Sequence, residues 1–463
     1  MRKSFLILIS ILLPICAFAT GRAYVYPDYP IAKIQQIIDE SDHIIFRKGV
    51  YNVDDNTSWF VKSNKKLTFE SGSRLDFTNT RAKQYESLFN IQGDNVVFEG
   101  LCFTSSSRCS RSVYGNGPRD GFSSLCTVIM IRGNNVKVLN SNIKNAEIAV
   151  SISSGNNIEI KKMYGECAQT IFATRCENLT ISNVKSLIKS DDVGDLDHHI
   201  YLKAKCSNVN ISDCEFIGGP SYAIQISGDY SDPYICPRNV DIRNVSIEQS
   251  KRGLCVDMAH SDVRVSKMNA VGLPSPDGDS FFLANRGGCV NITRSVISNY
   301  NYVELETLTT KDKIKGHTSF YRCSINFSNP YVCAFSLYYL DTLSVKKCSI
   351  KFYETSLFDG FIARTNPQIN NPQLIEFINN DIYISGIGRA CYRIPTDLTE
   401  VYINKCRFYN FDSKPGIFIS NDTKGNVNLK ENKSFGLSVD YESRFSLISS
   451  RKLNKAYNTF RND

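Results

Sequence analysis

A short repeat constrains the fold of this chain more than any other feature. Each unit has an asparagine, an apolar residue, a residue that is usually polar and a second apolar residue. The six clearest units start at Asn95, Asn135, Asn157, Asn178, Asn208 and Asn239. Apolar residues two positions apart indicate a β-strand with one buried side, whereas a helix would need apolar spacings of three and four. The chain is therefore expected to fold as a series of strand-containing units.

The series extends from near Leu67 to Val427, and successive units start 21 to 40 residues apart. Unequal spacing excludes a helical repeat of fixed length and fits coils that carry loops of different sizes. We predict an all-β parallel β-helix over residues 20–463, a single-stranded solenoid of about 14 coils with an irregular tail at about 435–463. A solenoid grows without a new core, so this length does not require several domains.

Asparagine before each strand has a conformational explanation. Asn tolerates left-handed backbone angles, and its side-chain amide bonds neighbouring turn groups. Stacked from coil to coil, these amides are expected to form a ladder inside the solenoid. In most units another apolar residue follows the first by seven positions, but Gly165 and Ser186 replace it in the coils that begin at Ile158 and Leu179.

The repeat also predicts the core. The first apolar residue of each unit and the residue two positions later should be buried and stacked: Val209, Ile211, Val240, Ile242, Val263 and Val265. Four cysteines follow a repeat start by five residues and are expected to be buried thiols without disulfide bridges: Cys214, Cys323, Cys348 and Cys406.

The N-terminus has the pattern of a secretory signal peptide, residues 1–19. Arg2 and Lys3 precede the apolar run Phe5–Leu13, and Ala17–Ala19 forms a cleavage site of small residues. Cys16 leaves lipid anchoring open, although Ile15 is large for that processing. No second apolar run of about 18 residues follows, so no transmembrane segment is expected, and the protein is predicted to be secreted or periplasmic.

Asp28 and Pro30 are expected to begin a short helix, at about 28–40, as its N-cap and first-turn residue. The helix should cover the open end of the solenoid, and Ile44–Tyr51 should form the first strand and turn. A capping helix, a strand that ends in Gly-Val-Tyr and asparagine-marked coils resemble the pectate-lyase-like superfamily of right-handed β-helix proteins. The resemblance covers nearly the whole mature chain and implies a right-handed solenoid. That superfamily includes lyases, glycosidases, epimerases, phage tailspikes and binding proteins.

The formal net charge of +8 favours acidic ligands by long-range attraction. In an exported protein this suggests an acidic polysaccharide rather than nucleic acid as the partner. We expect a monomer.

The coil that begins at Leu179 carries an unusual insert with four carboxylates and two histidines before the strand Ile200–Lys203. The carboxylates, a candidate calcium site, are Asp191, Asp192, Asp195 and Asp197. If Ile200 and Leu202 point inward, strand alternation places three candidate catalytic residues on the outer face: His199, Tyr201 and Lys203.

Register with neighbouring coils adds further residues to this face. Arg175 should stack on Lys205 as a fourth candidate catalytic residue, and Gln225 and Asp257 should flank inward residues of the next two coils, with His260 close behind. Gln225, Asp257 and His260 are the candidate substrate-binding residues. Adjacent coils lie about 4.8 Å apart, so these side chains could share one groove.

This set suits two kinds of reaction. A uronate lyase or epimerase needs a base, here Tyr201, His199 or Lys203, and a cation such as Arg175 or calcium to neutralise the substrate carboxylate. A glycoside hydrolase needs two carboxylic acids, which the aspartate insert could supply. Asp191-Asp192 resembles the aspartate pair of polygalacturonases, and Asp197-His198-His199 preserves fragments of pectate lyase and alginate epimerase motifs. The other motif elements of those families are absent.

We therefore predict an exported carbohydrate-active β-helix protein, with lyase or epimerase chemistry on a uronate-containing glycan favoured. A glycoside hydrolase, and a non-catalytic carbohydrate-binding or adhesive β-helix, remain the alternatives. A binding protein could use an aromatic row for sugar stacking, for which Tyr338, Tyr339 and Tyr353 are available.

Overall fold

The structure is a computed structural model, and it describes twenty-one segments of the chain. They are residues 21–54, 56–78, 86–105, 126–188, 197–219, 221–229, 232, 235–257, 261–273, 280–306, 316–328, 333–338, 342–354, 359–364, 373–386, 389–393, 399–410, 418–419, 426–435, 453–456 and 459–460. The predicted signal peptide lies outside them, and its cleavage stays a prediction.

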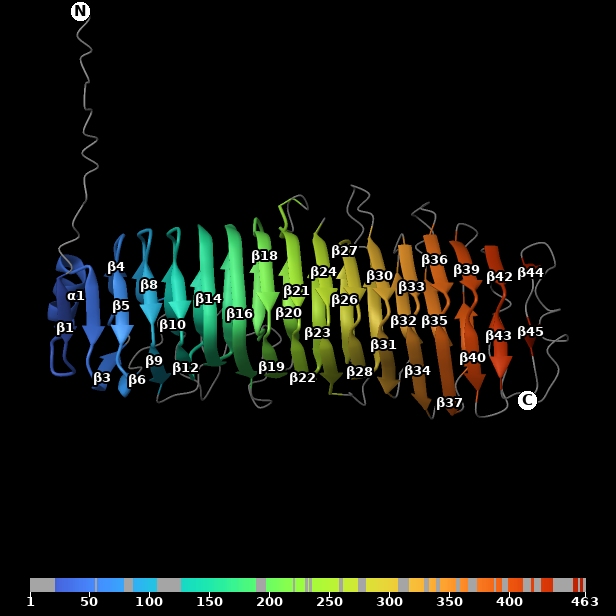
Figure 1. Ribbon diagram of the computed structural model, residues 1–463, viewed down its shortest axis with the longest axis horizontal. Coiled ribbons are helices and arrows are strands. Elements are labelled where there is room, and N and C mark those ends of the chain that lie inside the picture. The colour runs from blue at the N-terminus through green and yellow to red at the C-terminus, as the bar shows by residue number, and fades with distance from the viewer. Residues whose placement is uncertain are drawn as a thin grey trace, which may run out of the picture.

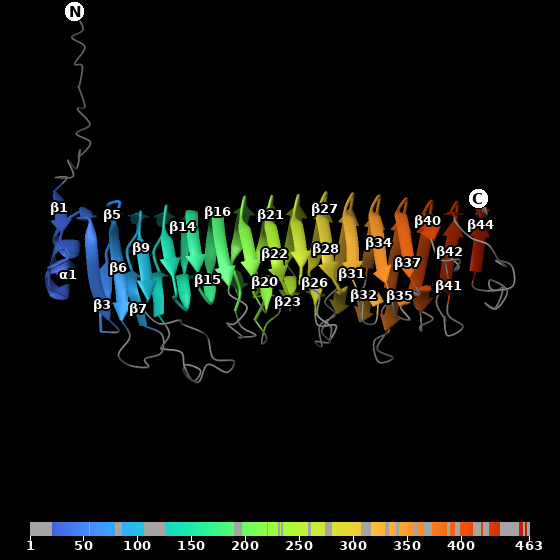
Figure 2. The ribbon, with the colours of Figure 1, turned by 90° about the horizontal axis from the view of Figure 1, so that it is seen from below.

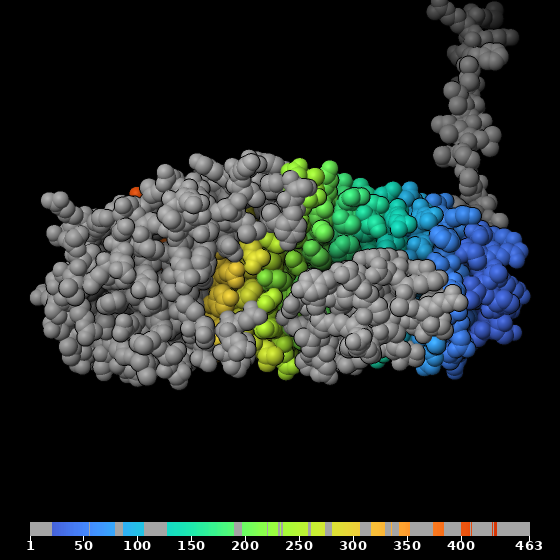
Figure 3. Space-filling view, turned by 180° about the vertical axis from the view of Figure 1, so that it is seen from behind, coloured from blue at the N-terminus to red at the C-terminus, as the bar shows by residue number. Residues whose placement is uncertain are grey.

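Within these residues the strands form two long parallel sheets, of 31 and 14 strands, wound into one solenoid (Figures 1 and 2). The predicted right-handed parallel β-helix is confirmed. Each strand pairs with the corresponding strands of the preceding and following coils, as in β18 with β16 and β21. Figure 3 shows the coils in the same order from behind, with the N-terminal end in blue.

The 14-stranded sheet contains one strand per coil. Its members are β4 (Trp59–Val61), β7 (Glu86–Ile91), β10 (Cys126–Ile131), β13 (Ile148–Ile152), β15 (Gln169–Thr174), β17 (Ile200–Lys203), β20 (Tyr222–Ser227), β23 (Arg252–Asp257), β26 (Phe281–Arg286), β29 (Tyr302–Glu306), β32 (Cys333–Tyr338), β35 (Asp359–Arg364), β38 (Arg389–Arg393) and β41 (Phe418–Ile419).

The 31-stranded sheet has two strands in most coils, separated by a bend. Its members are β1 (Arg22–Val25), β2 (His43–Phe46), β3 (Gly49–Asp54), β5 (Lys66–Phe69), β6 (Ser73–Thr78), β8 (Val97–Glu99), β9 (Cys102–Ser105), β11 (Lys137–Leu139), β12 (Asn142–Lys144), β14 (Gly155–Glu166), β16 (Cys176–Ile188), β18 (Ser207–Ser212), β19 (Glu215–Gly218), β21 (Arg238–Arg243), β22 (Ser246–Ser250), β24 (Asp262–Ser266), β25 (Asn269–Gly272), β27 (Cys289–Thr293), β28 (Val296–Tyr300), β30 (His317–Tyr321), β31 (Ser324–Ser328), β33 (Thr342–Lys346), β34 (Ser349–Glu354), β36 (Gln373–Ile378), β37 (Asp381–Gly386), β39 (Thr399–Asn404), β40 (Arg407–Asn410), β42 (Asn426–Lys430), β43 (Lys433–Phe435), β44 (Leu453–Ala456) and β45 (Thr459–Phe460).

The predicted core positions are buried in one continuous cluster. Each of the six has at most 1 % of its surface exposed, and each pairs with its counterpart in the next coil: Val209, Ile211, Val240, Ile242, Val263 and Val265. The four predicted interior cysteines are also buried and free. These predictions are confirmed.

The asparagine ladder is present, but it lies on the outside of the solenoid. Side-chain amides of successive coils are joined by hydrogen bonds of 2.9 to 3.2 Å, from Asn64 through Asn95 and onward to Asn239. All seven residues of the ladder have positive φ, between 52° and 60°, and their side chains are exposed. The predicted interior position was wrong because the amides stack above the turn that precedes each strand.

One helix, α1 (Ile31–Glu40), lies at the N-terminal end of the solenoid, where the capping helix was expected (Figure 1). Its buried residues are Ile34 and Ile38. The N-cap is Pro30, not the predicted Asp28, and no side chain caps the helix. Its predicted role in covering the end of the solenoid stays a prediction.

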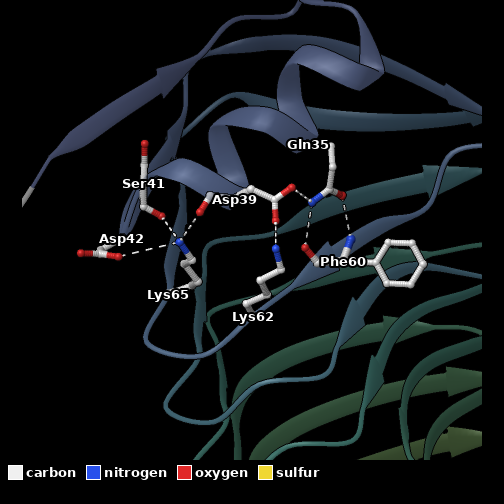
Figure 4. A network of polar contacts seen from close by, with 7 residues as sticks. All are labelled: Gln35, Asp39, Ser41, Asp42, Phe60, Lys62 and Lys65. Atoms are coloured by element: carbon white, nitrogen blue, oxygen red, sulfur yellow. Dashed lines mark hydrogen bonds and ion pairs between the residues drawn. The ribbon is translucent and has the colours of Figure 1, made fainter.

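Polar contacts join α1 to the first coils (Figure 4). Buried Lys65 donates from Nζ to the carbonyl oxygens of Asp39 and Ser41, at 3.0 and 2.7 Å. A cation at these carbonyls satisfies acceptors that the end of a helix leaves without partners. Gln35 bonds both backbone groups of Phe60, through its amide oxygen and nitrogen.

Candidate functional site

The strands of the 14-stranded sheet do not alternate strictly between core and surface. Near its start each strand from β7 to β26 has two consecutive residues that face inward, such as Ala223-Ile224 in β20 and Phe282-Leu283 in β26. The flanking residues face outward: Tyr222 and Cys255 belong to a separate cluster outside the main core. The outer face is therefore displaced by one residue from the face that strict alternation predicts.

This double inward position corrects the prediction for His199. The side chain of His199 is fully buried in the solenoid and stacks on Phe216, with ring centroids 5.1 Å apart. Its neighbour Ile200 is buried in the core as well. His199 therefore cannot contact a ligand on the outer face, because the inward pair at this strand is His199-Ile200.

The interior around His199 contains a chain of hydrogen bonds. Nε2 lies 3.1 Å from the carbonyl oxygen of Gly218, which only accepts, so Nε2 carries the proton. Nδ1 then accepts from the hydroxyl of Ser186 at 2.6 Å, and Ser186 accepts from Thr170 at 2.5 Å. Burial lowers the pKa of His199 to about 4, so the ring is neutral at pH 7.

The two coils that break the apolar repeat adapt the interior to this chain of hydrogen bonds. Gly165 and Ser186 occupy paired positions in adjacent coils. A β-carbon at Gly165 would lie 2.6 Å from a methyl carbon of Thr170, so the missing side chain makes room for Thr170. The irregular repeat was therefore a sequence signal for a buried polar network.

Tyr201 and Lys203 lie on the outer face as predicted. Both side chains are half-buried, and Ile200 and Leu202, which alternate with them along the strand, point into the core. Tyr201 pairs in register with Phe172 and Gln225, and Lys203 pairs with Thr174 and Ser227. The predicted register of this strand with Gln225 and Ser227 is confirmed, whereas the stacking of Arg175 on Lys205 stays a prediction.

An aromatic row runs along the solenoid axis on this face. Five contacts with ring centroids 5.2 to 6.2 Å apart join rings from five different strands or the segments next to them. The members of the row are Phe172, Tyr201, His198, Tyr222, Phe281 and Tyr302. Phe172, Tyr201 and Tyr302 are half-buried, whereas the other three are buried. Three rings of the row are therefore partly accessible to a ligand.

Charged groups border the aromatic row. The guanidinium carbon of Arg252 lies 5.5 Å from the ring centre of Tyr222 and 5.3 Å from that of Phe281, within cation–π range. Burial raises the pKa of Tyr222, so its phenol is protonated at neutral pH.

Two carboxylates on the same face share one arginine. Arg286 lies 3.4 Å from Glu304 and 3.9 Å from Asp257. Burial opposes the charge of Arg286, but the ionisable groups around it raise its pKa, so it stays protonated. Asp257 and Glu304 are therefore both paired with Arg286 on this face.

The remaining predicted residues have different positions. Arg175 is exposed at the bend that follows β15, and Asp257 is buried on the outer face beside Arg286. Asp197, the only described member of the aspartate insert, is fully buried. His260 and the other three aspartates lie outside the described residues: Asp191, Asp192 and Asp195. Calcium binding stays a prediction, and the described residues contain no group of three or more acidic, His or Cys side chains placed to hold a metal ion.

Sequence reasoning missed the residues on the later strands of this face: Tyr222, Arg252, Phe281, Arg286, Tyr302 and Glu304. Tyr222, Arg252 and Phe281 share a signal, because each lies one residue before an inward pair, and Arg286 lies four residues after the start of its pair. Tyr302 and Glu304 lie in β29, where buried and half-buried residues alternate. The sequence also suggested Tyr338, Tyr339 and Tyr353 as sugar-stacking residues of a binding protein. Tyr339 lies outside the described residues, and the side chains of Tyr338 and Tyr353 are not described.

Comparison with known proteins supports the fold. No family model and no curated protein matches the chain. Among solved structures it is similar to gene product 12 of bacteriophage phi29 in its pre-mature form, with 10 % identity, a TM-score of 0.50, and 94 % of this chain and 70 % of that chain covered. No helix in the described part of the chain is long and apolar enough to span a bilayer.

Two further solved structures show a weaker likeness. A Family 28 exopolygalacturonase of Yersinia enterocolitica is 12 % identical, with a TM-score of 0.45 and coverage of 89 % of this chain and 78 % of that one. PfbA, a surface adhesin of Streptococcus pneumoniae, is 12 % identical, with a TM-score of 0.35 and coverage of 89 % and 87 %. The two parallel sheets and the likeness to the phi29 protein make the chain a right-handed parallel β-helix protein, and the likeness concerns the fold alone.

Proposed function

We propose that this protein is exported and binds a polysaccharide along the outer face of its 14-stranded sheet, between β15 and β29. The observation that carries the proposal is the aromatic row from Phe172 to Tyr302, which follows the solenoid axis through β15, β17, β20, β26 and β29, with Arg252 of β23 between Tyr222 and Phe281. Extended sugar chains bind proteins through the apolar faces of their rings and through hydroxyl hydrogen bonds. Gln225 and Ser227 lie in register beside Tyr201 and Lys203 as hydrogen-bonding groups.

The charges of the site favour an acidic glycan. The described charges of this face are three cations, Lys203, Arg252 and Arg286, against the two carboxylates of Asp257 and Glu304, so the cations outnumber the carboxylates. A uronate carboxylate that binds beside Arg252 would gain a charge-assisted hydrogen bond. This supports the acidic polysaccharide expected from the overall charge.

Elimination or epimerisation at a uronate is the second candidate function. Tyr201 and Lys203 project from one short strand onto the same face, as a base and a cation of such a reaction must. Because His199 is buried, Tyr201 is the candidate base on this strand that contacts the aromatic row. Lys203 or Arg252 is the candidate cation that neutralises the substrate carboxylate.

One set of measurements separates these functions. The mature protein is titrated with neutral and uronate-containing oligosaccharides while ultraviolet absorbance and reducing ends are recorded. We expect Tyr201→Ala to weaken binding at least about tenfold, on the scale of one stacked ring in a binding site. Tyr164→Ala is the matched control, because Tyr164 is a half-buried tyrosine of β14 in the other sheet.

The outcomes are distinct. Rising absorbance that Tyr201→Phe or Lys203→Ala reduces about a hundredfold means elimination, and binding without either signal means a non-catalytic binder. Reducing ends without absorbance change mean hydrolysis. Equal affinities of Tyr201→Ala and the wild type would exclude the aromatic row as the binding site.

A further inference from the structure

A second column of residues with left-handed backbone lies at the bend between the two strands that each coil adds to the 31-stranded sheet. In early coils Asn is the commonest residue at these positions, at Asn140, Asn183 and Asn244, beside glycines, Lys162 and Asp213. In later coils basic residues prevail, although Asn379 and Glu431 also belong to the column, and we name the following set the basic ridge: Lys267, Arg294, Arg322, Lys347 and Lys405.

The backbone makes basic residues an unfavourable choice here. The φ angles of the basic ridge lie between 49° and 56°. An L-residue with a long side chain is strained in this region, whereas Asn and Gly tolerate it. Strain that is kept in successive coils suggests a function for the side chains themselves.

The ridge is continuous along the solenoid. The amide of Lys267 donates to the carbonyl oxygen of Thr293, and that of Arg294 donates to Tyr321, at 3.1 and 3.0 Å. The same bond links each following coil, through Arg322 and Lys347. Four successive coils therefore each present one cation, at a spacing of about 4.8 Å.

These four cations are exposed and available. All four side chains are solvent-exposed, and no carboxylate of the described segments lies within 4 Å of Lys267, Arg294, Arg322 or Lys347. Lys405, one coil beyond Asn379, is paired with Glu431 at 3.5 Å. The neighbouring acids Glu376 and Asp381 are paired with other bases, Lys346 and Arg407.

Tyr321 reports the positive potential of the ridge. Its hydroxyl lies 3.4 Å from Nζ of Lys347, and the guanidinium of Arg322 lies 5.2 Å from its ring centre. The hydrogen bond from Lys347 lowers the pKa of Tyr321, which is the effect of uncompensated positive charge on an ionisable phenol.

We propose that the basic ridge is a second binding site, which holds a linear acidic glycan parallel to the solenoid axis. The interval between coils is close to the length of one sugar residue in an extended glycan, so successive carboxylates or sulfates can each face one cation. This site lies at the bend of the 31-stranded sheet and does not depend on the aromatic row of the 14-stranded sheet.

A single-stranded nucleic acid suits the ridge less well. Such ligands gain affinity by stacking bases on aromatic side chains. Among the described residues of the ridge and the residues that directly precede them, only Tyr321 is aromatic. Arg322 and Lys347 already lie against its ring.

The test uses a double variant that the fold should tolerate. Arg322→Asn with Lys347→Asn removes two adjacent cations and introduces the residue that earlier coils use at the same backbone angles. The control is Lys161→Asn with Lys162→Asn, which removes the same charge; Lys162 lies in this column between Asn140 and Asn183. Binding of heparin and polygalacturonate oligosaccharides is measured at several salt concentrations, with single-stranded oligonucleotide as the competing class.

We expect the ridge variant to bind at least one acidic oligosaccharide at least about tenfold more weakly at low salt, with a salt dependence reduced by about two charges. The control should stay within about twofold of the wild type. Loss with heparin alone assigns sulfate, and loss with polygalacturonate as well assigns carboxylate. The proposal is overturned if both variants lose affinity equally, if neither does, or if the ridge binds the oligonucleotide more tightly than either glycan.

Discussion

The buried ring of His199 predicts a specific loss of stability in mild acid. Burial lowers its pKa in the folded protein to about 4, from an ordinary value of 6.5 in the unfolded chain. As pH falls below 6.5, His199 becomes protonated in the unfolded chain but stays neutral in the folded protein until the pH approaches 4. The contribution of His199 is therefore complete above pH 6.5 and is lost as pH falls towards 4.

The magnitude follows from the difference between the two pKa values. A difference of about 2.5 units corresponds to about 3 kcal/mol in total, of which about 2 kcal/mol is lost between pH 7 and pH 5. Protonation would also break the hydrogen bonds as they stand, because Nδ1 accepts from Ser186 and cannot accept once it carries a proton.

The assay is urea unfolding of the wild type and of His199→Gln at pH 7, 6 and 5. Gln has an acceptor and a donor but does not titrate. Other histidines whose pKa burial lowers, His43 and His317, are present in both proteins and cancel in the comparison. We expect the wild type to lose about 2 kcal/mol more than the variant between pH 7 and pH 5. Parallel pH profiles for the two proteins would refute the burial of a neutral His199.

Three further predictions concern the solenoid itself. Ile242→Asp should prevent folding, because an unpaired charge in the core costs several kcal/mol; native-like circular dichroism of this variant would show the register to be wrong. Asn239→Ala should destabilise by about 1 to 2 kcal/mol, because it loses the amide bond to Asn208 and retains a φ of 52°. Asn239→Gly, which tolerates that angle, should cost less in the same unfolding assay, and the opposite order would contradict this reading of the ladder. Peptide mapping of the unreduced protein should find Cys323 and Cys348 as free thiols, and a linked peptide would disprove the prediction.

The sequence predicted the fold and register well because both depend on local periodicity. Val209 and Ile242 could be assigned to the core from alternation alone, and the pairing of Tyr201 with Gln225 followed from the spacing of repeat starts. These features repeat in every coil, so each unit supports the assignment of the next.

The candidate site was predicted less well because it depends on a departure from that periodicity. Strict alternation placed His199 on the surface, but the inward pair at the start of each strand moved it into the core. The same displacement brings Tyr222 and Phe281 to the outer face, where they contact each other. The defects at Gly165 and Ser186 were visible in the sequence, but their polar partners, Thr170 and His199, come from a different sheet.

Hydroxyl-radical footprinting of the mature protein with a bound uronate oligosaccharide locates the face that binds the polysaccharide. We expect the oligosaccharide to reduce the oxidation of the half-buried rings of the aromatic row, Phe172, Tyr201 and Tyr302. Tyr164, in the other sheet, should be oxidised equally with and without the oligosaccharide. Unchanged oxidation of all three aromatic-row residues at a saturating ligand concentration would contradict binding along this row, because it would place the polysaccharide on another face of the solenoid.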